Sequence, residues 1–95
     1  MILQLAGDRV ALLEHDTFDK LGIVDTDRRP AAAIAGVLGG TADDGHVWVP
    51  AARILELGAE HGAEWADSAR ATFRAVERFG WYDAATDRVR VHVAP

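Results

Sequence analysis

The clearest secondary-structure signals of this 95-residue chain lie in residues 47–93, which read VWVPAARILELGAEHGAEWADSARATFRAVERFGWYDAATDRVRVHV. The apolar, β-prone run 47–49 predicts a short strand. Pro50 follows it, and proline is best tolerated at the first position of a helix, where its missing N–H would be unpaired anyway. Apolar residues recur at helical spacing behind this proline. They predict a helix over 51–61, with Gly62 as its end.

The rest of this stretch predicts a longer helix followed by a strand. Apolar residues recur at spacings of four, four and three, which is one face of a helix. They are Trp65, Ala69, Phe73 and Val76. Gly80 ends this helix. Residues 88–93 then alternate arginine or histidine with valine, as a half-buried strand does, and we expect a two-stranded hairpin here.

The N-terminal residues predict a β-hairpin. Residues 2–6 and 9–13 are largely apolar and flank a glycine–aspartate pair, which can take the positive φ angles of a two-residue turn. The alternative is a helix whose face holds Val10, Leu13 and Phe18. Periodicity over so few residues leaves both interpretations open.

Four further segments connect this hairpin to the strand at 47–49. Residues 16–21 can form a single helical turn, and 23–29 has the composition of a connector. The alanine-rich segment 31–38 follows a proline and precedes two glycines, so it is predicted to be a helix. The polar residues 41–46 are expected to form a solvated loop.

Helix, strand, helix, turn, helix and hairpin is the element order of a winged helix-turn-helix, and residues 30–93 resemble that superfamily. The resemblance implies an α+β fold in which residues 30–95 form a winged-helix-like core, with the first helix packed across the other two. Residues 1–29 would precede this core as a β-hairpin extension of the same domain. In such proteins the second helix of the motif usually enters the major groove of DNA, and the hairpin forms a wing.

Length, cysteine content and hydropathy narrow the class of protein. Ninety-five residues, 49% of them hydrophobic, make one globular domain. The absence of cysteine excludes disulfides and cysteine-based zinc sites. The longest apolar run is too short to span a bilayer, and no basic region opens the chain as in a secretory signal. We therefore expect a soluble, cytoplasmic protein.

The charge distribution bears on nucleic-acid binding. A formal net charge of −5 is a disadvantage, because binding to phosphates requires cations that replace counterions. However, residues 68–95 hold five arginines against three acids, a net of +2. The one basic region therefore coincides with the longer predicted helix and the hairpin.

The candidate binding residues are the cations of this basic region and one tryptophan. Three arginines spaced by four share a helix face, while two arginines and a histidine share one side of the hairpin strand. The set proposed to contact DNA or a partner protein is Arg70, Arg74, Arg78, Arg88, Arg90, His92 and Trp65. The simpler alternative is that these cations are the solvated faces of a helix and an edge hairpin.

Acidic residues at the front of the same helix argue against DNA. Recognition helices contact bases mainly through their N-terminal residues, and here these include Glu64 and Asp67, with Glu60 just ahead. Phosphates repel carboxylates. Helix stability also explains these acidic residues, because the helix dipole favours acids at a helix N-terminus by about 0.3–1 kcal/mol each.

Most of the aromatic residues are expected to form the core, because large rings dominate burial in a small domain. The predicted core comprises Trp48, Ile54, Leu57, Phe73, Val76, Val89 and Val91. Exposure of Trp65 or Trp81 would favour a protein-binding surface, because tryptophan and arginine are common interface anchors.

No pattern of catalytic or metal-binding residues is present. The four histidines lack a metal-ligand spacing, and no serine or threonine stands in a nucleophile-elbow motif. We therefore expect no metal, no cofactor and no enzymatic activity. Two hypotheses remain. The preferred one is a small DNA-binding or transcription-related module, and the alternative is a protein-interaction module that acts as a homodimer or an accessory subunit.

Overall fold

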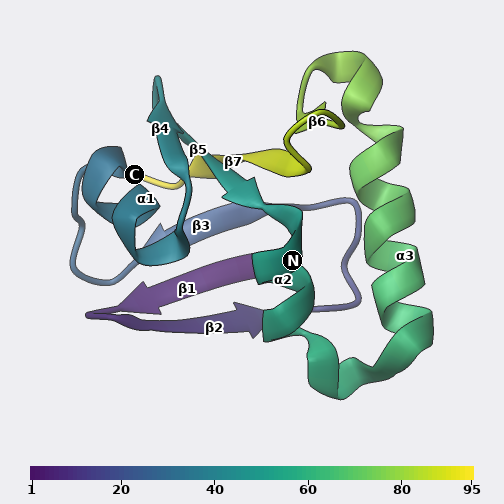
Figure 1. Cartoon of the computed structure of the whole chain (residues 1–95). Helices are drawn as coiled ribbons and strands as arrows, with labels where there is room; N and C mark the ends of the chain where they lie inside the picture. Colours follow the sequence, from purple (N-terminus) through teal and green to yellow (C-terminus); the bar gives the residue numbers. More distant parts are fainter.

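The chain folds into one mixed sheet with three helices (Figure 1). The computed structural model describes all residues 1–95. The strands are β1 (Ile2–Ala6), β2 (Arg9–Leu13), β3 (Gly22–Asp25), β4 (Thr41–Asp43), β5 (His46–Pro50), β6 (Tyr82–Asp83) and β7 (Arg88–Val93). The helices are α1 (Ala31–Leu38), α2 (Ala51–Leu57) and α3 (Gly62–Ala75), with the 3₁₀ turns η1 (Ala59–His61) and η2 (Glu77–Phe79). Six of the seven strands follow the order β2-β1-β3-β7-β5-β4, and the seventh, β6, pairs with β7 beside this path.

The predicted N-terminal hairpin is confirmed. β1 and β2 pair antiparallel with Ala6 opposite Arg9, and Gly7 in the turn between them has a φ of 60°. A two-residue hairpin turn requires positive φ, which glycine adopts without steric cost. Leu3 and Leu5 are fully buried, so the apolar alternation identified the face that β1 buries.

A central strand lies where a connector was predicted. β3 runs parallel to β1 on one side and to β7 on the other. Residues 16–21, before it, form turns instead of the predicted helical turn. Only Ile23 and Asp25 of the four β3 residues are buried, too few for an alternation to stand out. The position of β3 depends on its two neighbours in the sheet.

A further strand replaces part of the loop predicted over 41–46. β4 pairs antiparallel with β5, and the turn between them consists of Asp44 and Gly45, with φ of 46° and 77°. Aspartate followed by glycine is a strong hairpin signal, and the sequence did contain it. The strand itself was not recognised because all its three residues are exposed and none is part of an apolar alternation.

The three predicted helices are confirmed, although two of them are shorter than expected. α1 begins after Pro30 and ends at Gly39, whose φ is 74°. α2 begins after Pro50 and gives way to η1. α3 ends at Ala75, and η2 continues the chain. Proline at the starts of α1 and α2 and glycine directly after each of these two helices therefore indicated their positions well.

The packing of α1 corrects one expectation. The winged-helix resemblance implied that this helix crosses the other two. Instead α1 packs against β4 and β5, while α3 covers the opposite end of the sheet (Figure 1). The reason is that the β4–β5 hairpin follows α1 directly and folds back on it, so Ile34 and Leu38 are buried there.

One hydrophobic core of sixteen residues joins all parts of the chain. Of the predicted members, Ile54, Phe73, Val89 and Val91 are buried, as expected. Trp48, Leu57 and Val76 are only partly buried. Trp48 alternates with the buried Val47 and Val49, so its side chain lies on the outer face of the sheet.

The α+β class is confirmed, but a sheet of seven strands does not clearly match a winged-helix core. Residues 1–29 supply β1, β2 and β3, and β3 pairs with β7 in the middle of the sheet. Met1 and Ile23 are fully buried, so the segment 1–29 contributes to the hydrophobic core of the domain. No helix is both long and apolar enough to cross a membrane.

Candidate interaction surface and cavity

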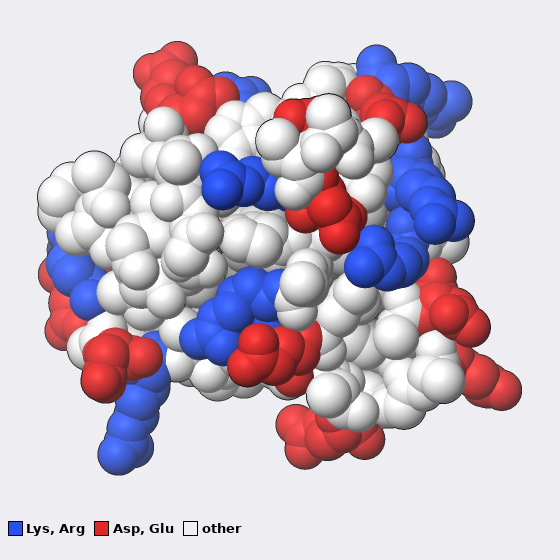
Figure 2. Space-filling view, in the orientation of Figure 1, with Lys and Arg blue, Asp and Glu red and all other residues white.

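The arginines of α3 and η2 lie opposite a buried stripe. Trp65, Ala69 and Phe73 face the core, whereas Arg74 and Arg78 are exposed. The space-filling view shows cations along the C-terminal half of α3 and acids along its N-terminal half (Figure 2). The guanidinium of Arg78 also lies 4.8 Å from the centre of the Phe79 ring.

Arg70 is engaged within the protein. Its Nη1 donates to Oδ1 of Asp87 at 3.3 Å, and the Tyr82 hydroxyl donates to the same oxygen at 2.6 Å. The bond from Tyr82 is the largest cause of a lowered pKa of the Asp87 carboxyl, and the same bond raises the pKa of Tyr82. These contacts tie α3 to the β6–β7 hairpin, so Arg70 has a structural role.

Both arginines of β7 are directed at β4. Arg88 donates from Nη1 to the Thr41 hydroxyl at 3.3 Å, and Arg90 donates from Nε to Asp43 Oδ2 at 3.1 Å. The indole N–H of Trp48 donates to the same Asp43 oxygen at 3.1 Å. Of the five predicted arginines, only Arg74 and Arg78 therefore have neither an ion pair nor a hydrogen bond with another side chain.

The two candidate tryptophans occupy opposite environments. Trp65 is only 7% exposed, and its indole N–H donates to the carbonyl of His15 at 2.6 Å. It therefore belongs to the core and is not available as an interface anchor, which corrects the prediction. Trp81 is 50% exposed and Phe79 56%, with ring centres 5.3 Å apart.

We call the surface formed by Arg74, Arg78, Phe79 and Trp81 the α3–β6 patch. Phe79 was not among the sequence-predicted binding residues. Its one sequence signal was its place at the end of the helical stretch, just before Gly80, where the chain leaves the helix and can present side chains to solvent.

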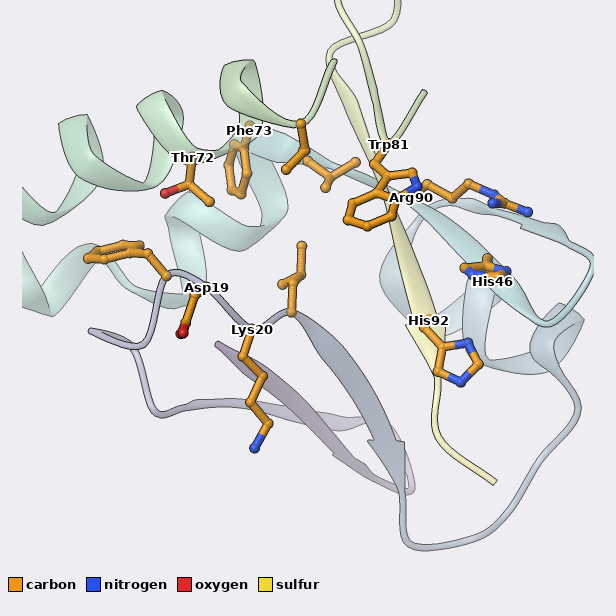
Figure 3. A pocket seen from close by; sticks show the side chains of 12 residues that line it. Asp19, Lys20, His46, Thr72, Phe73, Trp81, Arg90 and His92 are labelled. Carbon is orange, nitrogen blue, oxygen red and sulfur yellow. The ribbon is translucent and has the colours of Figure 1, made fainter. Parts of the chain in front are cut away.

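A cavity of about 210 Å³ adjoins this patch and was not predicted (Figure 3). Its apolar lining is Phe18, Leu21, Phe73, Val76, Trp81 and Val89, and its polar lining is Asp19, Lys20, His46, Thr72, Arg90 and His92. The rings of His46 and His92 meet edge to face with centres 5.1 Å apart. Five separate segments supply these residues, so no local motif could have identified the cavity.

The other two histidines form a second contact between distant segments. The rings of His15 and His61 are stacked, with centres 3.5 Å apart and planes 3° from parallel. Glu60 Oε1 lies 3.9 Å from Nε2 of His61. The structure contains no group of three or more histidine, cysteine, aspartate or glutamate side chains placed to hold a metal ion.

Comparisons of this chain with models of protein families, with curated proteins and with solved structures find no match.

Proposed function

We propose that this chain is a protein-interaction module that binds its partner through the α3–β6 patch. The observation that carries the proposal is the exposure of Phe79 and Trp81, 56% and 50%, beside two arginines that form no ion pair. Tryptophan and arginine are enriched among the residues that dominate binding energy in interfaces. Covering both rings with a partner removes apolar surface from water, which favours association.

The charges of the patch indicate the chemistry of the partner. Arg74 and Arg78 lie one helical turn apart, and neither has a carboxylate neighbour within ion-pair distance. A complementary partner is a polypeptide segment with carboxylates and at least one large apolar side chain. Opposite charges across the rim would speed association and select against basic partners.

A comparison of surface variants tests this function. The wild-type protein, a Trp81→Ser variant and a Val24→Ser variant are immobilised, and captured proteins are identified by mass spectrometry. Val24 is the matched control because it is 38% exposed but lies on β3 and is not part of the patch. We expect a partner that binds wild type and Val24→Ser and is lost with Trp81→Ser. Loss with Val24→Ser as well, or capture unaffected by Trp81→Ser, would contradict the proposal.

DNA binding is the second candidate, supported by the arrangement of residues 46–93. Both β5 and β6 pair with β7, and α2 and α3 lie between β5 and β6 in the chain. This order and pairing support a winged-helix-like interpretation of residues 30–95, in which α3 and the β6–β7 hairpin would face DNA. The engaged Arg70 and Arg90, together with the net charge of −5, place this candidate second.

Salt dependence distinguishes the two candidates. If the domain binds duplex DNA, affinity should fall steeply with salt, because each phosphate contact releases counterions. An Arg74→Ala/Arg78→Ala double variant should then bind more weakly and show a shallower salt dependence than wild type. A fluorescence titration with random-sequence duplex at two salt concentrations measures both. No binding by wild type at the lower salt would exclude the phosphate-contact mechanism.

A further inference from the structure

We propose that the cavity beside Trp81 binds a small carboxylic acid that carries one aromatic ring. This inference does not depend on the identity of a partner protein. The loop before β3, α3 and the strands β5 and β7 all contribute to the cavity, with the start of the β6–β7 hairpin forming one side (Figure 3). Its position, size and polarity each point to this class of ligand.

The cavity occupies a gap in the sheet. β5 pairs with β7 from Arg88 to His92 along one edge. The other edge of β7 is divided, since β6 pairs with it at Val89 and β3 pairs with it at His92. The N–H of Arg90 donates to the carbonyl of Trp81 at 2.7 Å, where the pairing partner changes. The sheet thus leaves an opening between β6 and β3, and the cavity lies there.

The size of the cavity limits the ligand to one ring. A cavity of about 150 Å³ lined by apolar side chains accepts benzene. The volume of about 210 Å³ therefore has room for a phenyl ring and a short substituent. Sites for drug-sized molecules start at about 300 Å³, so a nucleotide or a fused-ring coenzyme would not fit inside.

One end of the cavity is apolar and suited to an aromatic ring. Phe73 is 1% exposed and presents its ring to the cavity from α3, and Leu21 and Val76 also line the cavity. The indole of Trp81 forms the adjoining side (Figure 3). Aromatic rings attract one another in edge-to-face or offset arrangements beyond the effect of burial alone. An aromatic ligand ring would also cover Trp81, which is half exposed without it.

The other end carries donors suited to a carboxylate. His46, His92 and the Arg90 side chain lie together on one side of the cavity, and Asp19 lies on the other side with Lys20 (Figure 3). Arg90 donates from Nε to Asp43 at 3.1 Å, so its guanidinium extends toward β4 at the outer margin of this end, and its terminal amino groups form no hydrogen bond with another side chain (Figure 3). Guanidinium and carboxylate groups form short, strong hydrogen bonds, so an acid group is favoured here.

Phenylacetate and its neutral counterpart phenylacetamide test the proposal. Each compound is titrated into ¹⁵N-labelled wild-type protein, and amide shifts report both affinity and location. We expect saturable shifts concentrated at Leu21, Phe73, Trp81 and His92 with phenylacetate. Phenylacetamide should bind about tenfold more weakly, because it cannot form the charge-assisted bond.

Two variants and one control locate the two halves of the ligand. Leu21→Trp fills the cavity and should abolish binding of both compounds. Arg90→Gln should weaken phenylacetate about tenfold and leave phenylacetamide unchanged. The control is Arg88→Gln, which lies on the same face of β7 but does not line the cavity, and should bind phenylacetate as wild type does. Amide spectra without ligand verify that each variant is folded.

Several outcomes would overturn the proposal. One is the absence of shifts at the lining residues with phenylacetate at tens of millimolar. Another is equal affinity for phenylacetate and phenylacetamide, which would remove the carboxylate from the assignment. A third is equal weakening by Arg88→Gln and Arg90→Gln, which would indicate a general charge effect instead of a contact in the cavity.

Discussion

Asp25 is the only buried charged residue in the structure, with 8% of its surface exposed. Arg29 donates to both of its oxygens, from Nε at 2.8 Å and from Nη2 at 3.0 Å. The backbone N–H groups of Asp27 and Arg29 donate as well, at 3.1 and 2.9 Å. The Arg29 side chain is the main reason that the pKa of Asp25 lies well below its usual range. This cluster fixes the chain as it leaves β3 toward α1.

An Asp25→Asn variant should therefore melt at a lower temperature than wild type at neutral pH. The pKa of Asp25 is depressed in the folded state, so its stabilisation is fully present above the unfolded pKa of about 3.9 and declines progressively as the pH falls from there through the much lower folded pKa. Melting followed by circular dichroism at about pH 7 and about pH 3 measures this. An equal difference between the two proteins at both pH values would refute the role of the ion pair.

Phe73 tests the orientation of α3. The side chain is 1% exposed, so Phe73→Ala should lower the free energy of unfolding by about 3–5 kcal/mol, through lost burial and a residual cavity. Phe79→Ala is the matched control, because that ring is 56% exposed. It should change the free energy of unfolding by no more than about 0.5 kcal/mol. Urea denaturation measures both. Similar losses for the two variants would contradict the assignment of Phe73 to the core.

At the scale of elements, the junction of α2 and α3 depends on close contact between a glycine and a tryptophan. A Cβ at Gly58 would collide with the indole of Trp65, which is held by its bond to His15. A Gly58→Ala variant should therefore be destabilised by about 1–3 kcal/mol, the usual cost of overpacking.

Gly36 in α1 provides the opposite case. A Cβ there would meet nothing within 4 Å, and alanine is the better helix former. Gly36→Ala should raise the free energy of unfolding by about 0.5–1 kcal/mol. Denaturation curves of the two glycine variants give the comparison. A stabilising Gly58→Ala would show that the packing of Trp65 is looser than the structure indicates.

In the whole molecule, β2 and β4 end the six-strand path of the sheet, and each has one unpaired edge. β2 is the longer edge, with five residues against three, and Leu13 on it is 41% exposed. An edge strand can pair with a second copy of the chain, and antiparallel pairing about a two-fold axis is the commonest closed form. We therefore expect a homodimer joined along β2.

Light scattering should then give about twice the 10.2 kDa mass of the chain. Ala11 is exposed at the middle of β2, and in such a dimer it would face its own copy. Ala11→Lys should convert the dimer into a monomer without unfolding it, because like charges directly opposite each other repel. A wild-type protein that remains monomeric at high concentration would exclude this assembly.

The candidate site was only partly accessible from the sequence. The positions of the arginines on one helix face and one strand were predicted, since both depend on local periodicity. Whether these arginines are free to bind a partner was not predicted. The partners of Arg88 and Arg90 lie 47 residues earlier in the chain, and no local pattern reports such a contact. The same holds for Trp65 and Trp81, whose opposite exposures follow from packing against distant segments.

Local sequence patterns were enough to place several secondary-structure elements of this protein. Prolines marked where α1 and α2 begin, Gly7 and Asp8 marked the first hairpin, and alternation marked β7. Three features emerge only from the folded chain: β3 occupies the centre of the sheet, α1 packs on strands, and a cavity opens between β6 and β3. The physical reason is that capping, turn geometry and side-chain periodicity act over a few residues. Strand pairing, burial and charge neutralisation instead depend on which distant segments the whole fold brings together.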